Sequence, residues 1–343
     1  MPTPPSSQPV PPSAAPSSGS SAASGSSWSP DATVAEAGEF GLIGEFVRMF
    51  EQGEQVLVGP GDDAAVLRVR TGHVVVSTDL LVEGRHFRRD WVEAVDVGHR
   101  AAAQNISDIN AMGGRAQWLT IGLALPSDLP ARWALDFARG FAAECAGVGA
   151  SVVGGDLTGA SEIVVSVTVM GACTQSPVLR SGAAVGEVLA LAGRQGWAAG
   201  GLAVLGRGFR SPRALVEAYR RPEPPYAAGP AAADAGATSM IDVSDGLLAE
   251  AMHLAADSGV AIDVRRDAFD LPEPLHAVGA ALNIDPVSLV LSGGEDHSLL
   301  ATFPAGAALP EGWTVIGDVR EGEAGTVTVD GAPYDGPTGW THF

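Results

Sequence analysis

Lysine is absent from this sequence of 343 residues, in which all 20 basic residues are arginine. This absence excludes the chemistries that need a lysine amine, such as P-loop phosphate binding, the protein-kinase nucleotide site and Schiff-base catalysis. Cysteine is nearly absent too, since only Cys145 and Cys173 occur. Two cysteines in apolar surroundings form neither a disulfide framework nor a thiolate zinc site, so we expect both to be small core residues.

Long apolar runs and an excess of positive charge are also missing. No run approaches the roughly 18 residues of a membrane span, and the seven histidines form no HExxH pair. The formal net charge of −20 argues against a surface that neutralises a phosphate backbone. We therefore expect a soluble, cytoplasmic protein with neither a membrane nor a nucleic-acid partner.

The chain divides into three segments by composition. Residues 1–36 are rich in Pro, Ser and Ala and have no secretory-signal pattern, which predicts a disordered tail. Mixed helical and strand patterns follow, with a boundary near residue 175, so we expect domains at 37–175 and 176–343 and an α/β (α+β) fold. The predicted helices are 40–50, 96–112, 132–146, 197–205 and 245–258. The predicted strands are 74–77, 151–153, 163–169, 187–192, 240–242, 260–264, 298–303, 314–316 and 326–329.

Carboxylates recur beside Gly or Ser at the expected ends of strands and starts of helices. The clusters are Gly59-Pro-Gly-Asp62-Asp63, Ser77-Thr78-Asp79, Asn105-Ile-Ser107-Asp108, Gly154-Gly155-Asp156, Asp242-Val-Ser244-Asp245-Gly246 and Ser292-Gly293-Gly294-Glu295-Asp296. Bare carboxylates repel a nucleoside triphosphate, whereas a shared Mg²⁺ ion bridges the two sets of oxygens. Neighbouring glycines let backbone N–H groups reach phosphate oxygens. Together the clusters predict metal-carried phosphate binding without lysine.

Each cluster alone has an ordinary structural interpretation. Asp beside Gly is a common turn, and Ser or Asp before a helix is a common N-cap. Asp108 shares a helical face with Ala101 and Asn105, and that face is either solvated or a narrow ligand face. Asp156 directly follows an apolar strand, where ligand loops occur. The metal hypothesis therefore depends on the whole set of clusters.

Eight motifs resemble the thiamine-monophosphate kinase family, within the aminoimidazole ribonucleotide synthetase superfamily. They occur in the family's order: GEFGLIGEF (38–46), GPGDDAAVL (59–67), STDLLVEGRHF (77–87), NISDINAMGG (105–114), GGDLT (154–158), RSGAAVGE (180–187), IDVSDGL (241–247) and SGGED (292–296). The resemblance covers residues 38–343. It implies a two-domain fold whose N-terminal domains pair into a dimeric β-barrel, with a C-terminal α/β domain. It also implies Mg²⁺- and ATP-dependent phosphorylation of thiamine monophosphate to thiamine diphosphate.

The resemblance also implies the site residues, carried over motif by motif. The implied ligands of several Mg²⁺ ions are Asp63, Ser77, Thr78, Asp79, Asp108, Asp156, Asp242 and Asp245. The implied ATP contacts are Gly155, Asp156, Arg180 and Ser244. The implied contacts to the thiamine portion are His86, Asp296 and Trp340. His297 departs from the family, which usually has Tyr after the SGGED motif.

No general base or covalent residue is expected. A phosphate monoester is already largely ionised at neutral pH, so its oxygen attacks without deprotonation by the protein. The remaining tasks are to align two anions and to screen their charge. Two alternatives stay open: a superfamily synthetase acting on another acceptor, and a non-catalytic nucleotide or metal sensor. His86 and Arg180 also have plain structural alternatives, as a partly buried histidine and a surface arginine.

Overall fold

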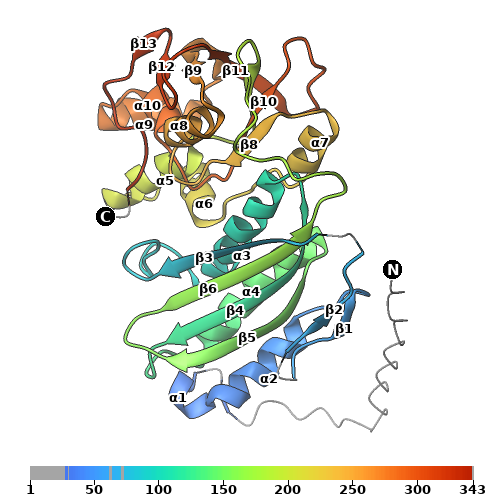
Figure 1. Cartoon of the computed structure of the whole chain (residues 1–343). Helices are drawn as coiled ribbons and strands as arrows, with labels where there is room; N and C mark the ends of the chain where they lie inside the picture. Colours follow the sequence, from blue (N-terminus) through green and yellow to red (C-terminus); the bar gives the residue numbers. More distant parts are fainter. Residues whose placement is uncertain (1–27, 30, 62–63, 71–72, 342–343) are drawn as a thin grey trace, which may run out of the picture.

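The structure, a computed structural model, describes residues 28–29, 31–61, 64–70 and 73–341. It has two lobes, each built around one large β-sheet (Figure 1). The described part of the expected N-terminal tail includes a short helix, α1 (Val34–Ala37), which Thr33 and Glu36 close with a capping box. Within the described residues, no helix has the length and apolarity to cross a membrane.

The first lobe contains a four-stranded sheet in the order β3-β6-β4-β5. Its strands are β3 (Val75–Val82), β6 (Val164–Ala172), β4 (Arg115–Leu125) and β5 (Ser151–Gly159). Only β4 and β5 run parallel. Two helices, α3 (Ala94–Ala111) and α4 (Ala131–Val148), cover one face. Because side chains alternate along a strand, Val165, Val167 and Val169 pack beneath these helices while their neighbours face the opposite side.

Helices α3 and α4 approach one another closely. A Cβ atom on Gly98 would lie 2.1 Å from the carbonyl oxygen of Phe137, and one on Gly140 would lie 2.0 Å from that of Val95. Any larger side chain at either position would force the helices apart. The two glycines therefore fix where α3 lies, and α3 carries much of the candidate site.

The chain before β3 packs at the β5 edge of the sheet. It consists of α2 (Glu39–Met49) and a hairpin of β1 (Val56–Val58) and β2 (Val66–Leu67). The Gly53 amide donates to Ser151 Oγ at 2.8 Å, and Gln52 Nε2 donates to the Val152 carbonyl at 2.9 Å. These bonds hold the loop between α2 and β1 against the beginning of β5.

The second lobe is a seven-stranded sheet in the order β13-β12-β9-β11-β7-β10-β8. Its strands are β7 (Val188–Ala192), β8 (Ser239–Asp242), β9 (Ala261–Val264), β10 (Leu299–Phe303), β11 (Trp313–Arg320), β12 (Val327–Val329) and β13 (Ala332–Pro333). Its helices are α5 (Trp197–Gly206), α6 (Arg213–Arg220), α7 (Ala228–Asp234), α8 (Leu247–Ser258), η1 (Arg266–Ala268), α9 (Glu273–Leu282) and α10 (Pro286–Leu291). Of its strand pairs only β12–β9 is parallel.

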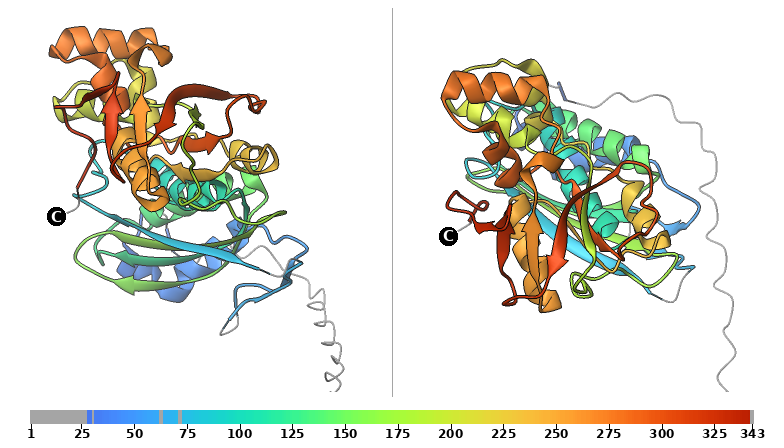
Figure 2. Two further views of the ribbon diagram at one scale, coloured as in Figure 1. Left: turned by 45° about the horizontal axis from the view of Figure 1, so that its top comes forward. Right: turned by 90° about the horizontal axis from the view of Figure 1, so that it is seen from above.

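Helix α3 lies between the four-stranded sheet and the second lobe, as Figures 1 and 2 both show. Ser107 Oγ donates to Asp242 Oδ2 at 2.8 Å. Asn110 accepts from the Gly229 amide at 3.0 Å and donates to the Pro225 carbonyl at 3.1 Å. These buried bonds bring the polar face of α3 against the end of β8.

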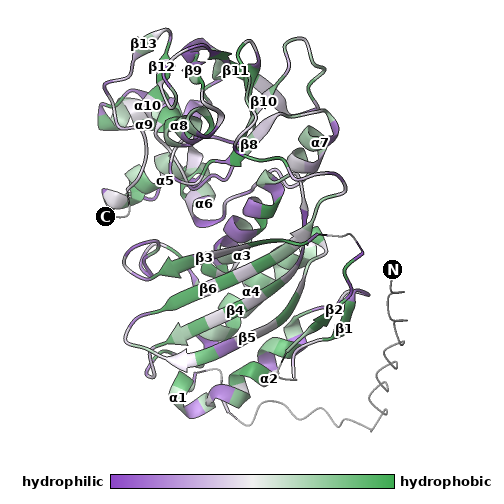
Figure 3. Ribbon diagram, viewed as in Figure 1, coloured by the Kyte–Doolittle hydropathy of each residue, from purple (hydrophilic) through white to green (hydrophobic). Residues whose placement is uncertain are grey.

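The expected α/β class is confirmed, and the expected elements are present with shifted ends. The strand predicted at 74–77 extends to Val82, and the helix predicted from Asp245 begins at Leu247. Strand β4, one of the two inner strands of its sheet (Figure 3), was not predicted, although its buried side chains alternate from Leu119 to Leu125. Both cysteines are free, Cys145 buried and Cys173 half-buried.

Candidate active site

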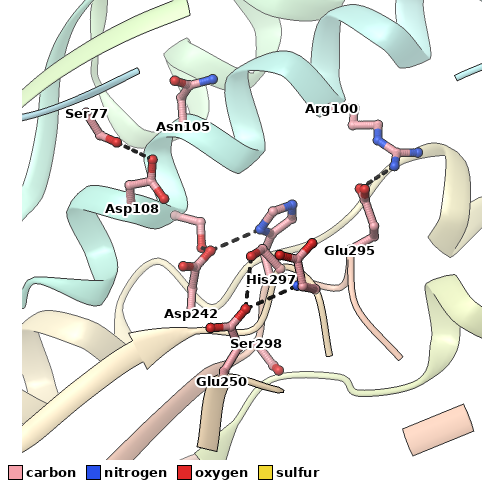
Figure 4. A network of polar contacts seen from close by, with 12 residues as sticks. Ser77, Arg100, Asn105, Asp108, Asp242, Glu250, Glu295, His297 and Ser298 are labelled. Carbon is pink, nitrogen blue, oxygen red and sulfur yellow. Dashed lines mark hydrogen bonds and ion pairs between the residues drawn. The ribbon is translucent and has the colours of Figure 1, made fainter. Parts of the chain in front are cut away.

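Three carboxylates gather where the two lobes meet. Asp79 comes from β3, Asp108 from α3 and Asp242 from the end of β8; Figure 4 shows Asp108 and Asp242 on either side of the lobe junction. Ser77 Oγ donates to Asp108 Oδ2 at 2.6 Å, and the Asp79 amide donates to Asn105 Oδ1 at 3.1 Å. Ser77 and Asp79 are two residues apart on β3, so their side chains point to the same face of the sheet. The face of α3 that carries Asn105 and Asp108 is therefore a buried face against β3, not a solvated one.

These carboxylates repel one another. Burial, followed by the negative charges of Asp242 and Asp79, raises the pKa of Asp108 to about 7. Burial also raises the pKa of Asp79, and His297 partly offsets that effect. Among the described residues, no arginine forms an ion pair with any of the three. The cluster is thus an excess of hard oxygen donors, with His297 as a nearby counter-charge to Asp79 and Asp108.

An oxygen-rich cluster of this kind fits a divalent cation. Mg²⁺ takes one or two carboxylates and completes its shell with water and phosphate oxygens. Within the described part of the chain, no three His, Cys, Asp or Glu side chains are arranged to ligate a single ion. The donor set therefore suits ions held by few protein ligands rather than a closed protein cage.

His297 lies beside the cluster and is 4% exposed. Its Nδ1 lies 3.0 Å from Asp242 Oδ2, and its Nε2 is buried without a hydrogen-bond partner. Burial alone would lower the pKa of His297, but the hydrogen bond and charge of Asp242 raise it above its ordinary value, with Glu295 and Asp108 adding to the effect. Its backbone φ of 52° lies in the left-handed region, as does that of Glu295 at 68°.

Two loops of the second lobe pack directly on one another at the site. The Glu295 amide donates to the Ser244 carbonyl at 2.8 Å. A Cβ atom on Gly294 would lie 2.0 Å from that carbonyl, so only glycine fits there. Glu250 accepts from Ser244 Oγ and from the Asp245 amide, each at 3.2 Å, and burial raises its pKa to about 7. The Trp340 amide donates to the Asp245 carbonyl at 2.9 Å, which ties the C-terminal segment to the same loop.

A cavity of about 460 Å³ adjoins these loops. Its walls contain residues from both lobes that the motifs single out: His86, Ser244, Asp245 and Trp340. Phe87, Trp91 and Tyr219 add further aromatic surface. His86 accepts a hydrogen bond from the Val82 amide at 3.0 Å, which orients its ring. The cavity suits a planar heterocycle bound beside a cluster of phosphate-handling carboxylates.

Arg100 belongs to this cavity and was not predicted from the sequence. It is 2% exposed, forms an ion pair with Glu295 and donates to the Tyr219 carbonyl at 3.2 Å. Its guanidinium also lies over the Tyr219 ring, 4.9 Å from the centroid. No local pattern separates Arg100 from a surface arginine on an α-helix; only the position of α3 between the lobes buries it.

Gly155 and Asp156 lie apart from the cluster. They line a second cavity of about 450 Å³, together with Pro60 and Gly61 and apolar residues of α2. Asp156 on β5 lies opposite Gly122 on β4. Gly122 in turn lies opposite Ser166 on β6, and Ser166 lies opposite Leu80 on β3, so Asp156 and Leu80 belong to one row of residues across the sheet. Asp156 therefore faces the opposite side of the sheet from Asp79. A Cβ on Gly155 would lie 2.3 Å from the Ile121 carbonyl, so this wall requires glycine.

The remaining predicted site residues that the structure describes also lie outside the carboxylate cluster. Thr78 lies on the opposite face of β3 from Ser77, and its hydroxyl pairs with that of Thr168 at 2.9 Å. Arg180 is exposed in the segment joining the lobes. Asp296 is buried and accepts from the Ala198 amide at the start of α5 at 2.9 Å; burial raises its pKa to about 7. Asp63 falls outside the described residues.

Comparison with known proteins agrees with this arrangement. The family described as AIR synthase related protein, N-terminal domain, matches residues 61–173. Thiamine-monophosphate kinase of Mycobacterium tuberculosis is 46% identical over 313 residues, covering 91% of this chain and 93% of the relative. The chain belongs to the thiamine-monophosphate kinase family. The resemblance inferred from the motifs is confirmed.

Solved structures of the thiamine-monophosphate kinase family share the fold. The Aquifex aeolicus enzyme has a TM-score of 0.73 at 31% identity and covers 89% of this chain and 100% of its own. A structure of AaThiL complexed with AMPPCP and TMP has a TM-score of 0.73 at 34% identity, covering 90% of this chain and 98% of its own. The two-lobed arrangement is therefore that of the family.

Proposed function

We propose that this chain transfers the γ-phosphoryl group of ATP to thiamine monophosphate, forming thiamine diphosphate and ADP. An acceptor phosphate oxygen forms the new bond to the γ-phosphorus, and the bond to the β-phosphate oxygen breaks with its electron pair leaving on ADP. One observation carries the proposal: a carboxylate cluster with no arginine partner among the described residues lies beside an aromatic-lined cavity. Family membership and the neighbour bound to AMPPCP and TMP support the two substrates.

The proposed roles follow where the side chains lie. Asp79, Asp108, Asp242 and Asp245, with Ser77, hold Mg²⁺ at the lobe junction. Mg²⁺, when bound, screens the phosphate charges and polarises the transferring group. Asp63, Thr78 and Asp156 remain proposed ligands of further ions from the resemblance alone. No residue is assigned as a general base, because the acceptor oxygen is ionised at neutral pH.

The cavity at the lobe junction is assigned to the thiamine substrate. His86 and Trp340 line the 460 Å³ cavity and would contact the thiamine portion. Asp296, buried behind it, would act by shaping the loop that bears Glu295. The proposed ATP contacts come from the resemblance: Ser244 lines the cavity at the lobe junction, Arg180 lies in the segment joining the lobes, and Gly155 and Asp156 line the 450 Å³ cavity, with Asp156 facing the opposite side of the sheet from Asp79. We also propose domains at 37–175 and 176–343, a tail before them, and a cytoplasmic location.

The decisive experiment follows phosphorus directly. ³¹P NMR of the purified protein with ATP, Mg²⁺ and thiamine monophosphate should show thiamine diphosphate and ADP appearing together, and EDTA should stop both. The same sample without thiamine monophosphate is the control and should leave ATP intact. ATP consumption only with a different acceptor would assign the chain to a sister synthetase activity. If ATP is not consumed with any acceptor, the chain would instead be a non-catalytic nucleotide or metal sensor.

A homodimer is proposed through the uncovered face of the four-stranded sheet. On β3, Val76 and Leu80 are 57% and 53% exposed, although they lie in a well-paired strand. Two apolar side chains on an open sheet face, next to a free strand edge, are a liability unless another chain covers them. A second copy packing its own sheet on this face would close the dimeric barrel implied by the resemblance.

Leu80→Arg should convert the dimer to a monomer. Burying an unpaired guanidinium in an apolar interface is strongly unfavourable, so we expect at least a tenfold weaker dimerisation constant. Sedimentation velocity over a concentration series measures it. Met252→Arg, an exposed apolar residue on α8 in the other lobe, is the matched control and should leave the dimer intact. A monomeric wild type, or a dimer that tolerates Leu80→Arg, would rule out this interface.

A further inference from the structure

Gln195 is a buried residue that the proposed reaction does not use. It lies in the turn between β7 and α5, is 7% exposed, and does not line the 460 Å³ cavity. Glutamine is usually exposed, because burying its amide is unfavourable unless other hydrogen bonds replace those to water. The partners of this amide therefore indicate why it is buried here.

Gln195 lies where two neighbouring strands diverge. Strands β7 and β10 pair antiparallel as far as Ala192 and Leu299. Beyond Ala192 the chain turns into α5, whereas the loop 292–298, which follows α10, leads into Leu299. The side chain of Gln195 bridges the fork between these two segments.

The whole amide of Gln195 is hydrogen-bonded across this fork. Its Nε2 donates to the Gly293 carbonyl at 2.6 Å and to the Val290 carbonyl at 2.9 Å. Its Oε1 accepts from Ser298 Oγ at 2.7 Å. A glutamine amide has two N–H donors and one acceptor oxygen, and all three are used. One side chain thus holds both ends of the loop 292–298.

The loop also contacts α5 in the reverse direction. Asp296 Oδ1 accepts from the Ala198 amide, in the first turn of α5, at 2.9 Å. A Cβ atom on Gly293 would lie 2.1 Å from the Leu289 carbonyl and 2.9 Å from the Cβ of Ala199. The loop is therefore held directly against α5 with no space between them.

This loop needs such support, because two of its residues have unfavourable backbone conformations. Glu295 and His297 have φ values of 68° and 52°, which side-chain-bearing residues adopt only where their surroundings hold them. Gly293, Gly294 and Glu295 line the 460 Å³ cavity, as does the start of α5. The shape of this cavity consequently depends on the contacts that fix the loop to α5.

We propose that Gln195 is a positioning residue for thiamine monophosphate, which holds the loop 292–298 in the conformation that lines the cavity. The inference rests on the proposed function for the identity of the substrate. Gln195 acts from behind the cavity wall and does not touch the ligand. Without its amide, two buried carbonyls lose their donors and Glu295 leaves its position. Because Asp79 and Asp108 come from other segments, substrate binding should suffer more than the chemical step.

Gln195→Met removes the donors at similar side-chain length. We expect KM for thiamine monophosphate to rise about tenfold at saturating ATP, with kcat and KM for ATP changing less than about threefold. Hydrogen exchange of the substrate-free protein, followed by mass spectrometry, should be at least about threefold faster over 292–298. A lower melting temperature with KM and exchange over 292–298 unchanged would overturn the proposal.

Thr302→Val is the matched control. Thr302 is fully buried on β10, and its hydroxyl lies 2.7 Å from those of Thr238 and Ser239, away from the fork. Val keeps the shape and loses these bonds, so the melting temperature should fall while KM stays the same. A rise in KM equal to that of Gln195→Met would show that any loss of stability raises KM, and would overturn the proposal.

Ser298→Ala decides the question if Gln195→Met does not fold. It removes only the bond to Oε1 and keeps both bonds from Nε2. We expect a smaller rise in KM for thiamine monophosphate, about threefold, together with faster exchange over 292–298. No change in either quantity would overturn the positioning role.

Exchange and turnover together separate this inference from the proposed function. Thiamine diphosphate formation by the wild type, with KM and loop exchange unchanged in Gln195→Met, would reject the positioning role and keep the kinase. Faster exchange over 292–298 in Gln195→Met, in a protein whose wild type phosphorylates no thiamine monophosphate, would keep the support of the loop by Gln195 and reject the kinase.

Discussion

Asp108→Asn should lower turnover about 1000-fold while making the metal-free protein more stable. The ionised form of Asp108 is destabilised by its surroundings, since burial and the charges of Asp242 and Asp79 raise its pKa to about 7. Asn keeps an oxygen that accepts from Ser77 but loses the negative charge that holds a cation. Losing one metal contact worth about 4 kcal/mol in the transition state corresponds to about 10³ in rate.

The stability gain should depend on pH with a definite sign. The folded pKa of Asp108 is above the ordinary value near 3.8, so the folded protein holds this proton more tightly than the unfolded chain. The contribution of Asp108 to wild-type stability therefore falls as pH rises from about 4 to about 7 and is level above that. Asp108→Asn removes this fall. We expect its advantage to be about 1–3 kcal/mol at pH 8 and to vanish near pH 4.

Urea unfolding of metal-free protein at both pH values and initial rates with Mg²⁺ measure the two effects. Asp267→Asn, an exposed carboxylate in η1, is the matched control and should change neither. A variant that turns over at the wild-type rate would remove Asp108 from the metal site. A loss of activity together with a loss of stability at pH 8 would point instead to a structural role.

Local sequence patterns predicted that several helices end near a glycine, but they did not always identify the glycine at which the helix ends. Gly259 stops α8 in the left-handed region as predicted. The helix predicted at 132–146 should have ended before Gly147, yet α4 continues to Val148 and ends at Gly149, whose φ is 71°. Both glycines carry the same local signal, and only the position that needs a positive φ ends the helix.

Part of the candidate site was predictable because strand alternation and helix spacing are local. Ser77 and Asp79 share one face of β3, and Asn105 and Asp108 share one face of α3. The two-residue repeat of a strand places Thr78 on the opposite face of β3 from Ser77 and Asp79. The sequence alone therefore indicates that Thr78 does not lie in the same carboxylate cluster as these two residues.

The rest of the site depends on packing between distant segments. Glu295 and His297 both have positive φ values, which turn consecutive side chains of the SGGED-His loop in directions that an ordinary strand would not give. As a result Glu295 lines the cavity, while Asp296 is buried at the start of α5. Arg100 lies beneath this loop because α3 is placed between the two lobes, a position that no local pattern reveals.

Arg100→Met should reduce kcat/KM for thiamine monophosphate about 100-fold, chiefly by raising KM. Met fills similar volume but leaves the Glu295 carboxylate unpaired at a cavity that already adjoins Asp245. An anionic acceptor then meets an uncompensated negative charge, and about 3 kcal/mol of repulsion corresponds to about 10². Arg221→Met is the matched control, because it breaks the ion pair with the buried Asp96 outside this cavity and should cost stability without raising KM.

The double variant Arg100→Met/Glu295→Gln decides how Arg100 acts. If Arg100 works by neutralising and holding Glu295, removing both charges should recover at least tenfold in kcat/KM over Arg100→Met, since replacing both partners of a buried pair is far less damaging than removing one. Steady-state kinetics with varied thiamine monophosphate at saturating ATP separate KM from kcat in all three proteins. No recovery in the double variant would show that Arg100 has a function independent of Glu295. A purely structural role would instead lower the melting temperature of Arg100→Met with KM unchanged.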